Sequence, residues 1–203
     1  MSKNTKKSMK QTVMVILLIC AVFTVISLLN YEKPQQQKQI SHPLISEEIR
    51  ELQPMVEKYA EEYRVSDHVD VILAMMMQES GGRGDDPMQS SESYCGEVGC
   101  IDDPELSIKQ GVYYFSQTLE AANGDIELAV QSYNFGKGFI DYVEKNAGKY
   151  SQEIAIDFSR KMYDEDRETY TCYRDEAKQY DACYGDIYYV RDVMAYKDAL
   201  ANG

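Results

Sequence analysis

Glu79 is the residue whose type and position most clearly suit chemistry. It ends an apolar stretch, VDVILAMMMQE at 69–79, that Gly81 and Gly82 terminate. Burial raises the pKa of a carboxyl group, and the negative end of a helix dipole raises it further. A carboxyl that stays protonated near neutral pH can donate a proton to the leaving oxygen of a glycosidic bond. The alternative at this stage is an ordinary glutamate that faces solvent at a helix end.

Two segments after Glu79 could complete a cleft. The first is a glycine-rich polar loop, SGGRGDDPMQSSES at 80–93, and loops of this kind often carry binding residues. The second is YNFG at 133–136, which places an aromatic ring and an amide at the end of a helix, where both can face a sugar.

Helices are the elements predicted to position these residues. Apolar side chains recur at helical spacing, and no stretch alternates convincingly as a strand would. Asp103 and Pro104 form a favourable start for one helix, and Pro54 predicts a kink or a break in another. The predicted helices cover 46–63, 69–79, 104–122, 125–134, 139–146, 151–163 and 186–200. The fold class is therefore mainly α.

The N-terminal segment has the composition of a membrane anchor. Residues 12–29 are eighteen residues without a charge, and four lysines precede them. A cleaved signal peptide is the alternative, but no small-residue cleavage pattern closes the apolar run. The prediction is a basic cytoplasmic tail at 1–11, a transmembrane signal anchor at 12–29, a polar linker at 30–45 and an extracytoplasmic domain at 46–200. The protein is thus expected in the cell membrane, as a single-pass protein.

Charge excludes some partners for the domain. Of 21 basic and 34 acidic residues, four lysines and no acid lie within 1–30, which leaves a net charge of −17 for the rest. Such a domain would be repelled by nucleic acid and by anionic lipid head groups. We therefore expect no nucleic-acid partner, and a ligand with neutral contact groups, such as a glycan.

Four cysteines outside the apolar run favour disulfides. Cys95, Cys100, Cys172 and Cys183 form two sequence-local pairs, and an even count is typical of an oxidising compartment. Three connectivities are possible, and we expect the local one because each loop closes at small entropic cost. The spacing does not suit zinc, so we expect no metal and no cofactor.

Several motifs together resemble one family. They are MMMQESGGRG at 75–84, DPMQSSES at 86–93, SIKQGVYYF at 107–115, the YN-x-G turn at 133–136 and YGDIYYVRDVMAY at 184–196. These segments resemble the CwlT-like lysozyme domain family, which comprises cell-wall hydrolases of Gram-positive conjugative elements related to goose-type lysozymes and soluble lytic transglycosylases. The resemblance covers about 52–196.

The resemblance implies a lysozyme-like helical domain that acts on peptidoglycan, with Glu79 as the catalytic acid. The residues that it places around the scissile bond are Ser80, Gln89, Glu92, Tyr133 and Asn134. The expected reaction is cleavage of the β-1,4 bond between N-acetylmuramic acid and N-acetylglucosamine.

Two mechanisms remain open. An inverting muramidase needs a second carboxylate roughly 6.5–9.5 Å from the acid, for which Asp85, Asp86 and Glu92 are candidates. A lytic transglycosylase would use Glu79 as acid and then as base, and would leave 1,6-anhydro-muramic ends. The resemblance favours the muramidase.

A non-catalytic alternative is a wall-binding scaffold of a conjugation or secretion apparatus. Such an apparatus is also the protein partner that we expect for an enzyme. The other tyrosines, including Tyr113, Tyr114, Tyr188 and Tyr189, are expected mainly in the core and at its rim, with stacking of one or two of them on a pyranose as the alternative.

Overall fold

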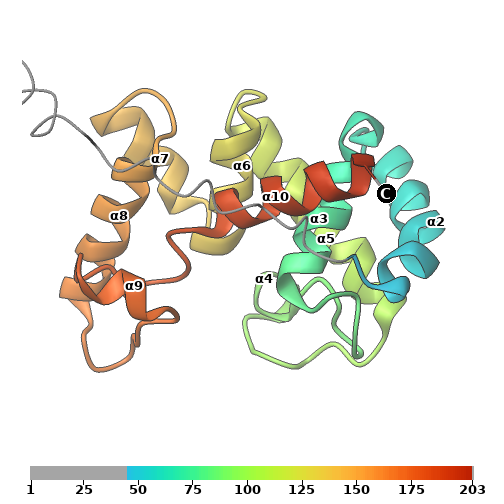
Figure 1. The fold of residues 1–203 in the computed structure, drawn as a ribbon, viewed down its shortest axis with the longest axis horizontal. Helices are drawn as coiled ribbons and strands as arrows, with labels where there is room; N and C mark the ends of the chain where they lie inside the picture. The colour runs from blue at the N-terminus through green and yellow to red at the C-terminus, as the bar shows by residue number, and fades with distance from the viewer. Residues whose placement is uncertain (1–44, 203) are drawn as a thin grey trace, which may run out of the picture. The chain divides into compact units, whose positions relative to one another are not determined.

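The computed structural model describes residues 45–202 (Figure 1). The predicted basic tail, transmembrane anchor and almost all of the linker therefore lie outside the described residues. Between residues 45 and 202 no helix is both long enough and apolar enough to cross a membrane. This part of the chain is helical and contains no strand, which confirms the predicted fold class.

The helices follow one another along the chain with short connections. They are α2 (Glu47–Glu62), the 3-10 helix η1 (Ser66–His68), α3 (Val69–Glu79), α4 (Ser91–Cys95), α5 (Pro104–Ala121), α6 (Ile126–Phe135), α7 (Gly138–Asn146), α8 (Gln152–Glu165), α9 (Asp175–Lys178) and α10 (Tyr189–Asn202).

Side-chain caps define where four of these helices begin. The side chains of Ser46, Asp103, Asp125 and Ser151 each accept a hydrogen bond from a backbone N–H in the first turn of the helix that follows. Such a cap satisfies one of the N–H groups that have no partner within the helix. The predicted Asp103-Pro104 start is confirmed, with Pro104 as the first helical residue.

A kink or a break was predicted at Pro54, and the break is wrong, because α2 continues through this residue. Proline removes one hydrogen bond to the carbonyl four residues earlier, here that of Arg50. Arg50 and Pro54 are both exposed, so water can bind this carbonyl. The opposite side of α2 holds the helix in place, since Ile49 and Val56 are fully buried there.

Two short helices and one helix start differ from the sequence-based prediction. The helices α4 and α9 were not predicted, and α10 begins at Tyr189 instead of residue 186. The carboxylate of Asp186 accepts from the backbone N–H of Tyr188 at 2.9 Å. This contact and the ion pair described below hold residues 186–188 in a turn ahead of the helix.

The helix α3 lies in the centre of the core. All six residues from Val71 to Met76 are buried, because α2 covers one side of the helix and α10 runs along another. Figure 1 shows α10 crossing the molecule from the side of α7, α8 and α9 to the side of α2. This packing places Tyr189, the first residue of α10, beside Glu79, the last residue of α3.

Candidate active site

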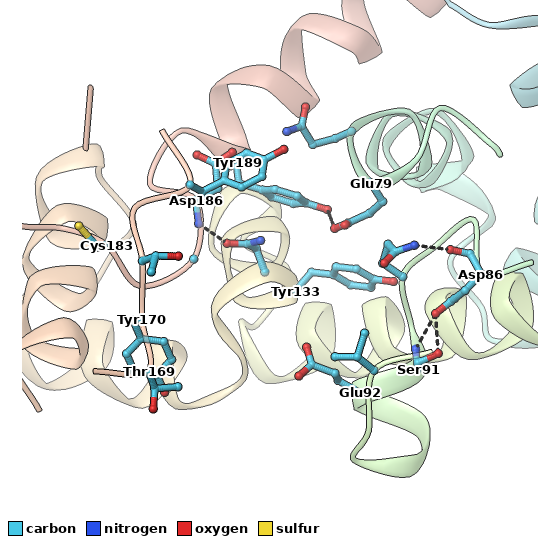
Figure 2. A pocket seen from close by; sticks show the side chains of 17 residues that line it. Glu79, Asp86, Ser91, Glu92, Tyr133, Thr169, Tyr170, Cys183, Asp186 and Tyr189 are labelled. Carbon is cyan, nitrogen blue, oxygen red and sulfur yellow. Dashed lines mark hydrogen bonds between the residues drawn. The ribbon is translucent and has the colours of Figure 1, made fainter. Parts of the chain in front are cut away.

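A cleft of about 570 Å³ opens beside the C-terminal end of α3. Glu79 and the segment from Asp86 to Glu92 form one wall. The segments 169–173 and 183–189 lie opposite, as Figure 2 shows for Thr169, Tyr170 and Asp186. The cleft is thus bounded by residues about a hundred positions apart in the sequence.

Glu79 has the environment of a general acid. The pKa of its carboxyl group is raised from 4.5 to about 7, chiefly by burial and to a smaller extent by the nearby carboxylates of Asp86 and Asp186. The hydroxyl of Tyr189 donates a 2.6 Å hydrogen bond to Oε1 of Glu79 (Figure 2), which acts in the opposite direction. The balance leaves a substantial protonated fraction near neutral pH.

Tyr189 is held in place by the packing of α10 on α3. Its side chain is only 2% exposed, so the ring has little freedom to move away from Glu79. Burial raises the pKa of the Tyr189 hydroxyl well above its ordinary value, and the hydroxyl therefore stays protonated. It can serve only as the donor towards the Glu79 carboxylate.

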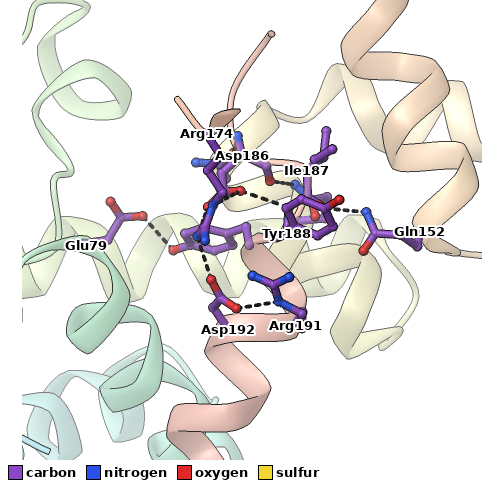
Figure 3. Close-up of polar contacts among 11 residues, drawn as sticks. Glu79, Gln152, Arg174, Asp186, Ile187, Tyr188, Arg191 and Asp192 are labelled. Carbon is purple, nitrogen blue, oxygen red and sulfur yellow. Dashed lines mark hydrogen bonds and ion pairs between the residues drawn. The ribbon is translucent and has the colours of Figure 1, made fainter. Parts of the chain in front are cut away.

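A buried ion pair fixes the segment before Tyr189 (Figure 3). The guanidinium of Arg174 contacts Asp186 at 2.9 and 2.6 Å and Asp192 at 2.6 Å. Asp186 is 5% exposed and Arg174 22%, so this contact is largely shielded from water. Arg174 therefore connects the loop before α9 to the turn at 186–188 and to the first turn of α10, which contains Tyr189.

Asp86 lines the cleft but its oxygens are already occupied. Oδ1 accepts from the N–H of Ser90 at 2.9 Å and the hydroxyl of Ser107 at 2.6 Å, and Oδ2 accepts from the hydroxyl and N–H of Ser91 at 2.6 and 3.1 Å. Partial burial alone would raise the pKa of Asp86, but these hydrogen bonds outweigh it and lower the pKa. The carboxylate is ionised, and its role is to hold the loop 86–91.

The other residues predicted from the sequence divide into two groups. Gln89, Glu92, Tyr133 and Asn134 line the cleft with Glu79, whereas Ser80 and Asp85 are not among its lining residues. Ser80 instead donates to the carbonyl of Pro87 at 2.7 Å and accepts from the N–H of Gly82 at 3.0 Å. Ser80 thus closes the base of the loop that follows Glu79.

Tyr133 and Asn134 each hold a neighbouring segment while they face the cleft. The hydroxyl of Tyr133 donates to the carbonyl of Met88 at 2.8 Å, and Oδ1 of Asn134 accepts from the N–H of Asp186 at 2.8 Å. A Cβ at Gly185 would lie 2.7 Å from this same oxygen, so only glycine allows the approach. The two residues connect α6 to both walls.

The cleft is also lined by residues that the sequence analysis did not identify as site residues. Tyr189 was grouped with core and rim tyrosines, although it lies within the matching motif at 184–196, which was the available signal. Asp186 lies in that motif too. The stretch 169–173 matches no motif, and only its position in the fold reveals that it lines the cleft.

Both predicted disulfides are present in the structure. Cys95 is bonded to Cys100, and Cys172 to Cys183. Each closes a loop that contributes to the cleft, through Val98 in the first and Tyr173 in the second. Within residues 45–202 no group of three or more histidine, cysteine, aspartate or glutamate side chains is arranged to hold a metal ion.

Comparisons with known proteins identify the family of this chain. The family model described as lysozyme-like matches residues 46–197. The bifunctional muramidase/DL-endopeptidase CwlT of Bacillus subtilis is 44% identical over 152 residues, which are 75% of this chain but 42% of that protein. The uncharacterized membrane protein YocA of the same organism is 37% identical over 74% of this chain and 68% of its own length.

A solved structure is similar to this chain in both sequence and fold. The Staphylococcus aureus protein described as similar to a lipoprotein of the NLP/P60 family superposes with a TM-score of 0.65 and is 39% identical. The alignment covers 75% of this chain and 53% of that one. This chain thus spans about half or less of the length of that protein and of CwlT.

Proposed function

We propose that this chain, which belongs to the lysozyme-like family of cell-wall hydrolases, cleaves the β-1,4 bond between N-acetylmuramic acid and N-acetylglucosamine in peptidoglycan. The predicted family membership and the predicted class of enzyme, a muramidase-type hydrolase or lytic enzyme, are confirmed by the comparisons. The bond that is cleaved and the role of each residue are our proposal. The observation that carries it is the buried, protonatable carboxyl of Glu79 at the wall of an open cleft.

Glu79 is proposed to donate its proton to the glycosidic oxygen as the bond to the sugar breaks. A general acid is most effective when its pKa lies near the working pH, and a pKa of about 7 meets that condition. Tyr189 orients the carboxyl through Oε1, and it stabilises the carboxylate that remains after proton transfer.

Glu92 is the best supported candidate for activating water in an inverting hydrolysis. It lines the cleft, it is exposed, and its carboxylate makes no hydrogen bond or ion pair within the described residues. Asp86 is already engaged by four donors, and Asp85 does not line the cleft. Among the three candidates, Glu92 alone combines access to the cleft with free acceptor positions.

The second candidate mechanism is that of a lytic transglycosylase, in which Glu79 acts as acid and then as base. A single carboxyl whose pKa is about 7 can serve as the acid when protonated and as the base when ionised. The muramidase is favoured because the similar protein CwlT is described as a muramidase.

Mass spectrometry of fragments released from intact peptidoglycan tests the proposal. Reducing muramic ends are expected for the muramidase, and Glu92→Gln should then slow their release. Anhydro-muramic ends, with Glu92→Gln as active as the parent, would establish the transglycosylase instead.

Glu79→Gln should abolish fragment release in either case. Glu144→Gln, which changes an exposed glutamate on α7 that does not line the cleft, is the control and should leave fragment release unchanged. If Glu79→Gln released fragments at the parent rate, Glu79 would not be the acid. A folded parent chain that binds peptidoglycan but releases nothing would favour the non-catalytic scaffold.

The membrane attachment is proposed from the sequence of residues 12–29 and gains support from the similar protein YocA, which is described as a membrane protein. The domain would then act outside the cytoplasm, close to the membrane. A conjugation or secretion apparatus is the proposed partner, on the strength of the family resemblance alone. Recovery of the chain from the culture medium instead of the membrane fraction would contradict the anchor.

A further inference from the structure

Two disulfide-closed loops extend the cleft beyond Glu79. The loop closed by Cys95 and Cys100 contributes Val98, and the loop closed by Cys172 and Cys183 contributes Tyr173. Both side chains are strongly exposed, Val98 to 78% and Tyr173 to 72%. One cleft therefore presents an exposed valine and an exposed tyrosine from two separate loops.

Tyr173 is held near the catalytic segment despite its exposure. The guanidinium of its neighbour Arg174 lies 5.6 Å from the centroid of the ring. That guanidinium is itself fixed by Asp186 and Asp192 at 2.6 Å each. Tyr173 therefore lies beside the ion pairs that hold the start of α10 and Tyr189, even though most of its surface faces water.

The chemistry of the surrounding wall indicates which ligand the ring could take. No lysine, arginine or histidine lines the cleft, whereas Glu92 and Asp86 do, so an anionic ligand would be repelled. Thr169 and Thr171 lie in the same wall and offer hydroxyl groups as both donors and acceptors. An aromatic ring beside neutral hydroxyl groups suits the apolar face and the hydroxyl groups of a pyranose.

We propose that Tyr173, together with Thr169, Thr171 and Val98, forms an accessory sugar-binding subsite for the same glycan strand that Glu79 cleaves. The subsite rests on the proposed function, because its occupant is a further pyranose of that strand. It binds a sugar away from the scissile bond, so it contributes to the affinity for long strands and not for short ones.

The test measures glycan binding by the full chain in which Glu79→Gln prevents cleavage. The probes are the uncharged β-1,4-linked N-acetylglucosamine oligomers, a dimer and a hexamer. Adding Tyr173→Ala should weaken binding of the hexamer about two- to tenfold, the range expected for one aromatic contact, and should leave binding of the dimer unchanged. Tyr173→Phe should restore binding, because the ring remains.

Tyr113→Ala is the matched control, since Tyr113 is also an exposed tyrosine, at 42%, but does not line the cleft. The subsite is overturned if Tyr173→Ala binds the hexamer as tightly as its parent, or if Tyr113→Ala weakens binding equally. Fragment release by the chain with Glu79 intact separates the two proposals. If hexamer binding depends on Tyr173 but the chain with Glu79 intact releases no fragments, cleavage is refuted and the subsite is supported. If that chain releases fragments but Tyr173→Ala leaves hexamer binding unchanged, cleavage is supported and the subsite is refuted.

Discussion

Replacing Glu79 with glutamine should make the protein more stable, by an amount that grows as the pH rises. Burial raises the pKa of this carboxyl from 4.5 to about 7 in the folded state. Between these two values the folded chain holds a proton that the unfolded chain has released, so the free energy of unfolding falls as the pH increases. Glutamine has a similar shape and does not titrate, so the variant avoids this loss.

The size of the effect follows from the difference between the two pKa values. A difference of about 2.5 corresponds to about 3 kcal/mol once the pH is above the folded-state value. Below about pH 4 both states are protonated, and this contribution vanishes. The carbonyl oxygen of the glutamine can still accept the hydrogen bond that Tyr189 donates to Oε1, so this contact need not be lost.

Urea unfolding of the two proteins with their disulfides intact, at about pH 4 and about pH 8, measures the difference. The gain of Glu79→Gln over the parent should be larger by about 3 kcal/mol at the higher pH. Glu144→Gln should show no such increase, because an exposed carboxyl stays in water in both states. A gain that is the same at both pH values would refute the claim that Glu79 is buried in its protonated form.

Two further substitutions test the contacts around this acid. Tyr189→Phe removes the hydrogen bond that lowers the pKa of Glu79. The alkaline limb of the pH–activity profile should therefore move to higher pH. An unchanged limb would mean that this hydrogen bond does not affect the pKa of Glu79. Arg174→Met leaves the nearly buried Asp186 without its partner and should cost about 3–5 kcal/mol of unfolding free energy. Lys178→Met breaks an exposed pair that water and salt screen, so it should cost much less than Arg174→Met in the same urea unfolding experiment. Equal losses would contradict the assigned role of Arg174.

The sequence by itself determined the features that depend on contiguous residues. The helical class follows from the spacing of apolar side chains, and the start of α5 follows from Asp103 and Pro104, because a cap and a first turn are local. The two disulfides join cysteines that are close in the sequence. The position of Glu79 at the end of an apolar helix was likewise visible, and the motifs around it indicated the family.

Only the tertiary structure decided what surrounds that carboxyl. Tyr189 lies 110 residues from Glu79, and the two meet because α10 packs along α3. Asp86 and Ser80 have the residue types of catalytic and binding groups, yet their hydrogen bonds show that they hold the loop together. The wall at 169–173 has no motif at all. Whether a polar side chain faces a ligand or a neighbouring segment depends on distant packing, and the spacing of residues along the chain does not encode it.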